Sequence, residues 1–461
     1  MKVHFIAIGG SVMHQLAIAL SNKGYQVSGS DDEFFEPSKS NLAAEGLLPT
    51  ATGWFPEKLT PEIDAVILGM HAREDNEELQ RARQLGLNVY SFPEYIYRES
   101  RQKTRIVVGG SHGKTTTTSM IMHVLKQAGE EFDYLVGARL EGFDQSVQIT
   151  DAPVILCEGD EYPASVIEKQ PKFHFLYPHI AIITGIAWDH INVFPTFAFY
   201  LEQFSIFISR IEPGGILIYN ESDQILNKLV NEIDSGVRKI GYTIPLYTIA
   251  NGRTQVSLEG IDGTLRVFGS HNLLNLHAAY LACKQLGITT EVFLKAIAGF
   301  TGAAKRLELI AAGQSVNVYR DFAHAPSKVK ATIEAVKEQF PARKLIALLE
   351  LHTYSSLNAN FMVQYQGAME MADTAAVFYS SHALELKRMP DLPKAKVYEG
   401  FGKQGLSVIT NRTQLEEWLQ NNEYKNTSLL LMSSGNYDGL DVITFVNTII
   451  KREEQPVNPG T

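Results

Sequence analysis

A glycine-rich segment contains the residue types in this sequence that most clearly indicate a binding or catalytic function. An apolar strand expected over residues 105–108 breaks at Gly109, and the segment then runs through Lys114 into a helix. Glycines let successive backbone N–H groups turn inward, the helix N-terminus adds positive potential, and a lysine neutralises phosphate oxygens. The pattern predicts an ATP-type phosphate loop made of Gly110, Ser111, His112, Gly113, Lys114, Thr115 and Thr116.

The loop departs from the strict spacing, which asks for glycine at position 108, where this chain has Val108. The following helix is nevertheless well specified, because an apolar stripe from Met120 to Leu125 is ended by Gly129. In this context Thr115 offers a hydroxyl to Mg²⁺. The alternative is a glycine-rich turn with a surface lysine that binds no phosphate.

Carboxylates follow the next apolar strand, expected over residues 154–157. Glu158, Asp160 and Glu161 at one strand end would raise one another's pKa unless a cation lay among them. Oxygen ligands suit Mg²⁺, so we expect a magnesium site opposite the phosphates. An acidic loop without metal is the alternative.

A histidine occupies a similar place after a further buried strand, expected over residues 180–184. His190 follows Asp189 shortly after Gly185. Ligands of open parallel sheets lie at such strand ends, and we therefore expect His190 to bind metal or phosphate rather than to be structural.

The N-terminus has the pattern of a second nucleotide fold. A buried strand over residues 3–8 leads into a turn at Gly9 and a helix, and Asp31 follows the next strand, where a ribose hydroxyl is usually held. The dinucleotide fingerprint fails, because Ala7 and Val12 occupy two of its three glycine positions. NAD is therefore not predicted.

Two asparagines and a third set of strands complete the pattern. Asn272 and Asn275 lie one helical turn apart near a helix start, where their carboxamides can either face a purine edge or cap the helix. Further on, Arg306 and Asp321 accompany a third doubly wound unit. Its strands are expected over residues 316–319, 345–349, 375–379 and 429–432.

Length and composition frame these sites. A chain of 461 residues exceeds one core, and we expect domains over residues 1–103, 104–301 and 302–461, with a first linker at 98–103. The net charge of -10 with both signs scattered favours neither nucleic acid nor an anionic membrane as partner. Two cysteines, no secretory signal and no long apolar stretch predict a cytoplasmic protein without membrane insertion.

In this order the segments resemble those of the Mur ligases, ATP-dependent enzymes that join amino acids or peptides to UDP-N-acetylmuramate. The resemblance runs from Val3 to about Gly439. It implies an α/β chain of three domains: a Rossmann-like UDP-sugar domain, a central P-loop ATPase-like domain and a C-terminal Rossmann-like domain. It also implies a UDP-sugar site of Gly9, Gly10, Ser11, Met13, Ser30, Asp31 and His71.

The resemblance further implies roles in a two-step reaction, in which ATP turns the sugar's carboxylate into an acyl phosphate that an amine then attacks. Lys114, Glu158 and His190 would be catalytic. Thr115, Glu158 and His190 would serve Mg²⁺, Asn272 and Asn275 would meet adenine, Arg306 would reach phosphate, and Asp321 would hold the ribose. The chain departs from the usual family pattern at Gly185, Arg320 and Ala325.

A more specific expectation concerns which amine the protein uses. Members that use L-alanine carry Gln-Pro-His-Arg-Tyr-Ser-Arg, whereas residues 350–356 here lack both arginines. Residues 69–72 and 431–436 also look more like those of members that attach a murein tripeptide, L-alanyl-γ-D-glutamyl-meso-diaminopimelate. We therefore expect the tripeptide, with L-alanine as the alternative.

Two other classes of function stay open at this point. One is a binding protein that uses ATP only for domain closure, although Lys114, Glu158 and His190 are all present. The other is a folylpolyglutamate-synthetase-like ligase, which would lack the additional N-terminal unit expected over residues 3–99.

Overall fold

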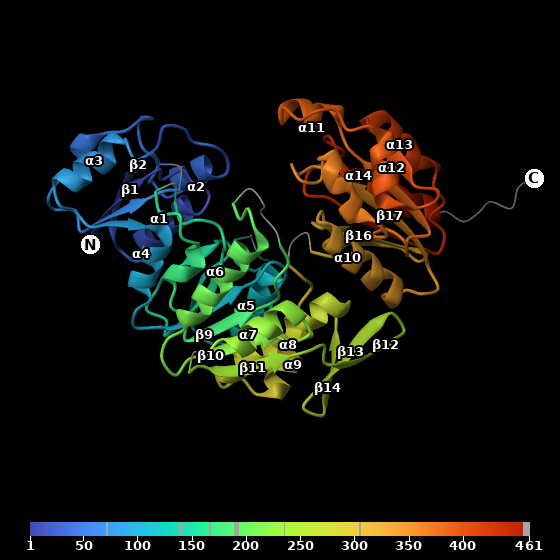
Figure 1. Cartoon of the computed structure of the whole chain (residues 1–461), viewed down its shortest axis with the longest axis horizontal. Helices are drawn as coiled ribbons and strands as arrows, with labels where there is room; N and C mark the ends of the chain where they lie inside the picture. Colours follow the sequence, from blue (N-terminus) through green and yellow to red (C-terminus); the bar gives the residue numbers. More distant parts are fainter. Residues whose placement is uncertain are drawn as a thin grey trace, which may run out of the picture. The chain divides into compact units, whose positions relative to one another are not determined.

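The computed structural model describes residues 1–70, 72–137, 140, 142–165, 167–188, 193–234, 236–303 and 306–454. They belong to two compact units, one of residues 1–244 with 274–297 and one of 245–273 with 298–461. Three large α/β sheets follow one another along the chain, from the blue N-terminal part to the red C-terminal part of Figure 1. This confirms the predicted α/β class with three sheet-based folds.

The first sheet is entirely parallel, so all its carboxyl ends lie at one edge. Its strands are, in spatial order, β2 (Gln26–Ser30), β1 (Lys2–Ile6), β3 (Ala65–Leu68) and β4 (Val89–Ser91). Its helices are α1 (Met13–Asn22), α2 (Ser38–Ala44), α3 (Glu77–Gln84) and α4 (Phe92–Glu99), with a short 3-10 turn η1 (Pro56–Lys58). The turns after β1 and β2 are therefore neighbours.

The second sheet places the phosphate loop at its centre, because β5 (Thr104–Gly109) pairs in parallel with strands on both sides. The spatial order is β11 (Arg238–Tyr242), β10 (Ile216–Asn220), β9 (Ile180–Ile183), β5, β8 (Val154–Glu158), β6 (Phe132–Leu135) and the antiparallel β7 (Val147–Gln148). Its helices are α5 (Lys114–Ala128), α6 (Phe197–Ser209), α7 (Gln224–Glu232) and α9 (Thr290–Ile297), with the 3-10 turn η2 (Lys172–Phe175), and α8 (Ser270–Gln285) leads back to it.

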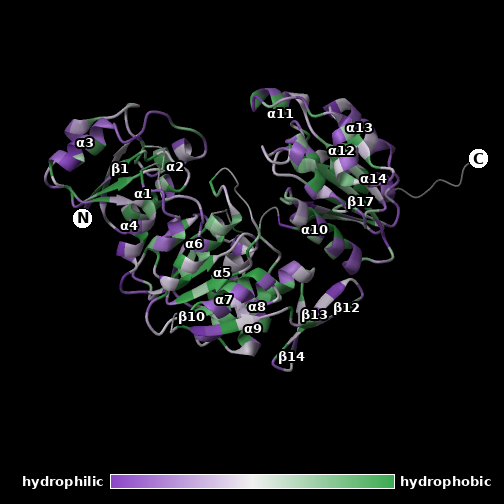
Figure 2. Cartoon of the chain, in the orientation of Figure 1, coloured by the Kyte–Doolittle hydropathy of each residue, from purple (hydrophilic) through white to green (hydrophobic). Residues whose placement is uncertain are grey.

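The central strands are apolar on both faces, as a parallel sheet covered by helices requires. Ile106, Val107 and Val108 of β5 are all fully buried, and the strands of this sheet are mostly green in the hydropathy view of Figure 2. Val108, which stands where the strict pattern has glycine, therefore occupies a core position of the sheet.

Among its described residues, the second unit contains a six-stranded sheet whose only antiparallel pair is at its edge. The order is β15 (Glu308–Ala312), β16 (Val316–Asp321), β20 (Thr427–Met432), β17 (Lys344–Glu350), β18 (Thr374–Phe378) and β19 (Ser407–Ile409). Its helices are α10 (Pro326–Gln339), α11 (Ser381–Leu386), α12 (Lys394–Phe401), α13 (Arg412–Asn421) and α14 (Val442–Glu454), with the 3-10 turn η3 (Ala359–Tyr365). A separate antiparallel sheet consists of β12 (Leu246–Ala250), β13 (Arg253–Leu258) and β14 (Ile261–Leu265).

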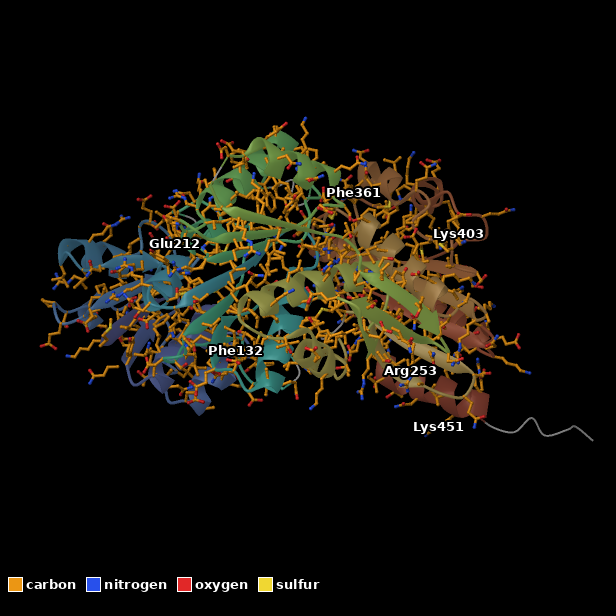
Figure 3. All side chains as sticks on the ribbon, turned by 90° about the horizontal axis from the view of Figure 1, so that it is seen from below. Phe132, Glu212, Arg253, Phe361, Lys403 and Lys451 are labelled. Carbon is orange, nitrogen blue, oxygen red and sulfur yellow. The ribbon has the colours of Figure 1, made fainter. Side chains whose placement is uncertain are left out.

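The segment expected as the first linker is more ordered than predicted, because α4 extends to Glu99. Beyond it, Lys103 is buried and its ammonium pairs with Asp133 and with the carbonyl of Thr150, 2.6 Å away. Arg105 pairs at 2.5 Å with Glu212, which is labelled in Figure 3. Across the described residues, no helix is both long and apolar enough to cross a membrane.

The buried pair of Lys103 and Asp133 generates a stability prediction. Replacing Asp133 by Ala leaves an uncompensated ammonium with 8 % exposure, which costs roughly 3–5 kcal/mol of unfolding free energy. We expect a lower urea midpoint for the intact chain, whereas Lys330→Met, which removes an exposed partner of Glu334, leaves it unchanged. Equal midpoints for the two variants would refute a stabilising role for the buried pair.

Candidate active site

The phosphate loop joins β5 to α5 through two glycines in the left-handed region. Gly110 has φ 126° and Gly113 has φ 83°. A Cβ at Gly110 would lie 2.3 Å from the hydroxyl of Thr184, and a Cβ at Gly113 would lie 2.3 Å from the carboxamide oxygen of Asn275. Both positions therefore require glycine for conformation and for space.

Ser111 fixes the loop to the neighbouring strand ends. Its backbone N–H donates to the carbonyl of Gly185 at 3.0 Å, and its hydroxyl lies 2.8 Å from the hydroxyl of Tyr200. Gly185 has φ 149°, which gives a conformational reason for glycine at this departure from the family pattern. Sequence reasoning missed Tyr200, because it lies within the mostly apolar α6 and carries no local signal.

Lys114, the first residue of α5, carries a stable positive charge in a nearly buried place. Its ammonium donates to the carbonyl of Gly110 at 2.6 Å and to the carboxylate of Glu161 at 2.7 Å. Burial by itself would lower the pKa of Lys114, but the carboxylates of Glu161, Glu158 and Asp160 together outweigh it and the pKa is raised. The loop therefore holds a cation where a phosphate could replace one carboxylate partner.

The three carboxylates at the end of β8 have different hydrogen-bond partners, and the charge of Lys114 acts on all three. Each has its own partner: Glu161 has Lys114, Asp160 has Lys172 at 2.7 Å, and Glu158 accepts from the Thr115 hydroxyl at 2.7 Å. Glu158 also accepts from the backbone N–H of Gly137 at 2.9 Å. Lys114 and Lys172 thus supply positive charge beside these carboxylates.

Thr115 and Glu158 together form a donor pair that fits Mg²⁺. Both supply hard oxygen atoms at the end of β8 and the start of α5, and Mg²⁺ commonly takes only one or two protein oxygens beside phosphate and water. No cluster of three or more His, Cys, Asp or Glu side chains able to hold a metal occurs among the residues that the structure describes. His190, like His71, lies outside the described residues.

The two asparagines of α8 have different surroundings. Asn275 is buried and its carboxamide oxygen accepts from the hydroxyl of Thr117 at 3.3 Å, which places it beside the loop and α5. Asn272 donates from its side-chain amide to the carbonyl of Phe268 at 2.9 Å. The structure therefore ties Asn275 to the phosphate loop and Asn272 to the backbone at the helix start.

In the second unit, Asp321 is the last residue of β16, and the charge of Arg306, which precedes β15, acts on its carboxylate. Asp321 accepts from the backbone N–H groups of Leu307 at 2.5 Å and Ala323 at 2.6 Å. Burial raises the pKa of Asp321 to about 6, against the opposing effects of Arg306 and these N–H groups. Arg320, one of the departures, pairs at 2.8 Å with Glu308 of the edge strand.

The turn after β1 brings two of the predicted UDP-sugar residues, Gly9 and Asp31, into contact. The backbone N–H of Gly9 donates to Asp31 at 2.7 Å, and burial raises the pKa of Asp31 to about 6 although this hydrogen bond opposes it. Ser30 is buried and accepts from the ammonium of Lys58 at 3.1 Å, a partner that the sequence did not reveal. Ser11 is exposed, whereas Met13 belongs to the apolar core.

The segment that lacks two arginines is closed by local hydrogen bonds. Thr353 and Ser356 hold each other, with backbone N–H to hydroxyl distances of 2.9 and 3.1 Å. The buried Glu350 accepts from the hydroxyl of Ser433 and, at 2.9 Å, from the backbone N–H of Tyr437. Residues 433–437 thus fold onto Glu350.

Comparison with protein families covers almost the whole chain. Residues 2–104 match the Mur ligase family, catalytic domain; residues 108–283 match the Mur ligase middle domain; and residues 305–435 match the Mur ligase, glutamate ligase domain.

Two relatives illustrate the sequence similarity. The UDP-N-acetylmuramate–L-alanine ligase of Aquifex aeolicus is 31% identical over 366 residues, covering 77% of this chain and 78% of that one. The enzyme of the same name from a Sulfurihydrogenibium species is 28% identical over 446 residues, covering 94% and 95%.

Solved structures support the fold. The UDP-N-acetylmuramate–alanine ligase of Thermotoga maritima has a TM-score of 0.67 at 22% identity, covering 98% of this chain and 99% of that one. A murein peptide ligase from Psychrobacter arcticus has a TM-score of 0.61 at 20% identity, covering 99% of both chains.

These comparisons correct the expected amine substrate. The murein tripeptide was inferred from the missing arginines, but the relatives that match most of the chain are named for L-alanine. That inference, which also drew on residues 69–72 and 431–436, was wrong. Lys387 lines the same cavity as Glu350 and His352, so missing arginines in one segment do not mean that the site lacks a cation.

The Lys114–Glu161 pair generates a prediction for nucleotide binding. Lys114→Met removes a charge-assisted contact to phosphate and should weaken ATP binding by about 10- to 100-fold, measured by titration calorimetry. Because the single variant leaves Glu161 buried without its cation, Lys114→Met/Glu161→Gln serves as the matched control. We expect the double variant to recover thermal stability but not ATP affinity, and recovery of both would remove Lys114 from phosphate binding.

Proposed function

The chain belongs to the Mur ligase family, the ATP-dependent amide ligases of peptidoglycan synthesis, and on that premise we propose that it joins L-alanine to UDP-N-acetylmuramate. The observation that carries the choice of amine is the 31% identity to an L-alanine ligase across most of both chains. The phosphate loop, with its charged lysine, supports the use of ATP.

We propose that the first step forms an acyl phosphate. A lactyl carboxylate oxygen of the sugar attacks the γ-phosphorus of ATP, the bond to the β-phosphate oxygen breaks, and ADP leaves with that electron pair. A carboxylate is a poor electrophile, and the transferred phosphoryl group supplies its leaving group. The sugar nucleotide would be held by Gly9, Gly10, Ser11, Met13, Ser30, Asp31 and His71.

Lys114 would act on this step by charge. Its ammonium is held at 2.7 Å by Glu161, and a triphosphate in the loop would offer it oxygens of higher negative charge density. Preorganised positive charge at the transferring group is the main means by which proteins assist phosphoryl transfer. Bound Mg²⁺ would neutralise phosphate charge, and Thr115, Glu158 and His190 would hold it.

The remaining ATP contacts would orient the nucleotide. We propose that Asn272 and Asn275 face adenine, that Arg306 reaches a phosphate and that Asp321 accepts from the ribose hydroxyls. The carboxylate of Asp321, with a pKa of about 6, is mostly ionised at neutral pH and can accept these hydrogen bonds.

In the second step, the amine nitrogen of L-alanine would attack the acyl carbon. The bond from that carbon to the phosphate-bearing oxygen breaks, inorganic phosphate leaves, and a proton is lost from nitrogen. The product amide retains the UDP-sugar, so one ATP is converted to ADP and phosphate for each amide formed.

The proposal predicts a strict substrate requirement. Purified protein with ATP, Mg²⁺ and UDP-N-acetylmuramate should release phosphate in proportion to amide only when L-alanine is added, as quantified by mass spectrometry of the product. Lys394→Met, which removes the charge of an exposed lysine of α12, serves as a control variant and should turn over L-alanine as the wild type does. Turnover with a murein tripeptide and none with L-alanine would contradict the proposed amine.

A further inference from the structure

A cavity of about 390 Å³ lies where the parallel strands of the second unit end. Its lining includes Glu350 at the end of β17, Ser380 after β18 and Asn436 after β20. These three strands are neighbours in the order β20, β17, β18, and ligands of open parallel sheets bind outside such carboxyl ends. The volume falls within the range of ligand pockets, roughly 300–1000 Å³.

One part of the cavity lining consists of carboxyl groups. The Glu350 side chain is 3 % exposed and is held by Ser433 and by the backbone N–H of Tyr437. Asp438 also lines the cavity. An incoming carboxylate would be repelled from this part.

The lining also contains an ammonium group from a different segment. Lys387 follows α11, is half-buried, and places its ammonium 4.9 Å from the centre of the Tyr354 ring. No carboxylate of the described residues lies within 4.0 Å of this ammonium as an ion pair. Lys387 therefore keeps an unneutralised charge beside the cavity.

The segment with the missing arginines cannot supply that charge itself. Thr353 and Ser356 stand where the L-alanine pattern has arginines, and their hydroxyls are used in hydrogen bonds to each other's backbone. Tyr354, between them in sequence, instead presents its ring to Lys387. The cation thus comes to the same segment from about thirty residues further along the chain.

We propose that Lys387 binds the carboxylate of the incoming amino acid and so replaces the absent arginines. The inference rests on the proposed function, because it assumes that the amine substrate is a small amino acid. A short substrate needs its carboxylate held so that its nitrogen meets the acyl carbon in a defined orientation. Lys387 is basic, whereas Glu350 and Asp438 are acidic. This difference would favour the substrate orientation in which the carboxylate lies at Lys387 over the opposite orientation.

The test compares L-alanine with L-alaninamide, which lacks the carboxylate. In Lys387→Met we expect the KM for L-alanine to rise by about 10- to 100-fold, the loss of one charge-assisted contact, while the KM values for ATP and UDP-N-acetylmuramate stay unchanged. Turnover of L-alaninamide should be the same in wild type and variant. Lys387→Arg should retain most of the L-alanine activity, and Lys394→Met should behave as wild type.

The outcomes separate the two proposals. If wild type uses L-alanine and Lys387→Met does so with the same KM, Lys387 does not bind the carboxylate and the proposed reaction stands. If Lys387→Met impairs L-alanine and L-alaninamide equally, its effect is structural and the inference is overturned. If wild type forms no amide from L-alanine, the proposed function fails and this inference fails with it.

Discussion

The structure depends on keeping one ammonium charged inside a nearly closed turn. Lys114 is held between a backbone carbonyl and the buried Glu161, and this carboxylate, together with Glu158 and Asp160, outweighs the effect of burial on the lysine pKa. A neutral lysine would have little attraction for triphosphate. Glu161, which helps to keep Lys114 charged, is also the partner that phosphate must displace. The lysine is therefore already charged before phosphate binds.

Several parts of the central sheet serve this arrangement. Parallel pairing of β5 with β8 and β9 brings the phosphate loop, Glu158 and Gly185 to one edge. Two glycines allow the turn, and Ser111 anchors it to its neighbours. The same principle recurs in the other sheets, where Asp31 and Asp321 each end a parallel strand and are held by backbone N–H groups. Polar groups thus gather at strand ends while the strands themselves stay apolar.

The sequence was sufficient for the features that are local in the chain. The phosphate loop, the end of α5 at Gly129 and most parallel strands could be predicted, because glycine, lysine and apolar runs act over a few residues. Tyr200, Lys58 and Lys387 could not, because each reaches its partner from a distant segment. The prediction of the amine substrate was wrong for the same reason. The missing arginines could be seen in one short segment, but the cation beside that segment comes from a distant part of the chain. The roles of His190 and His71, and the domain boundaries, stay predictions.

The central claim is that the loop directs the γ-phosphoryl group of ATP onto a substrate carboxylate. It is tested most directly with UDP-N-acetylmuramate whose lactyl carboxylate carries ¹⁸O in both oxygens, turned over with ATP and L-alanine in ordinary water. The account predicts that each inorganic phosphate released contains one ¹⁸O atom, because the carboxylate oxygen that attacked phosphorus leaves with it. Phosphate free of ¹⁸O, with the labelled oxygen that the carboxylate loses appearing in water instead, would contradict an acyl-phosphate intermediate.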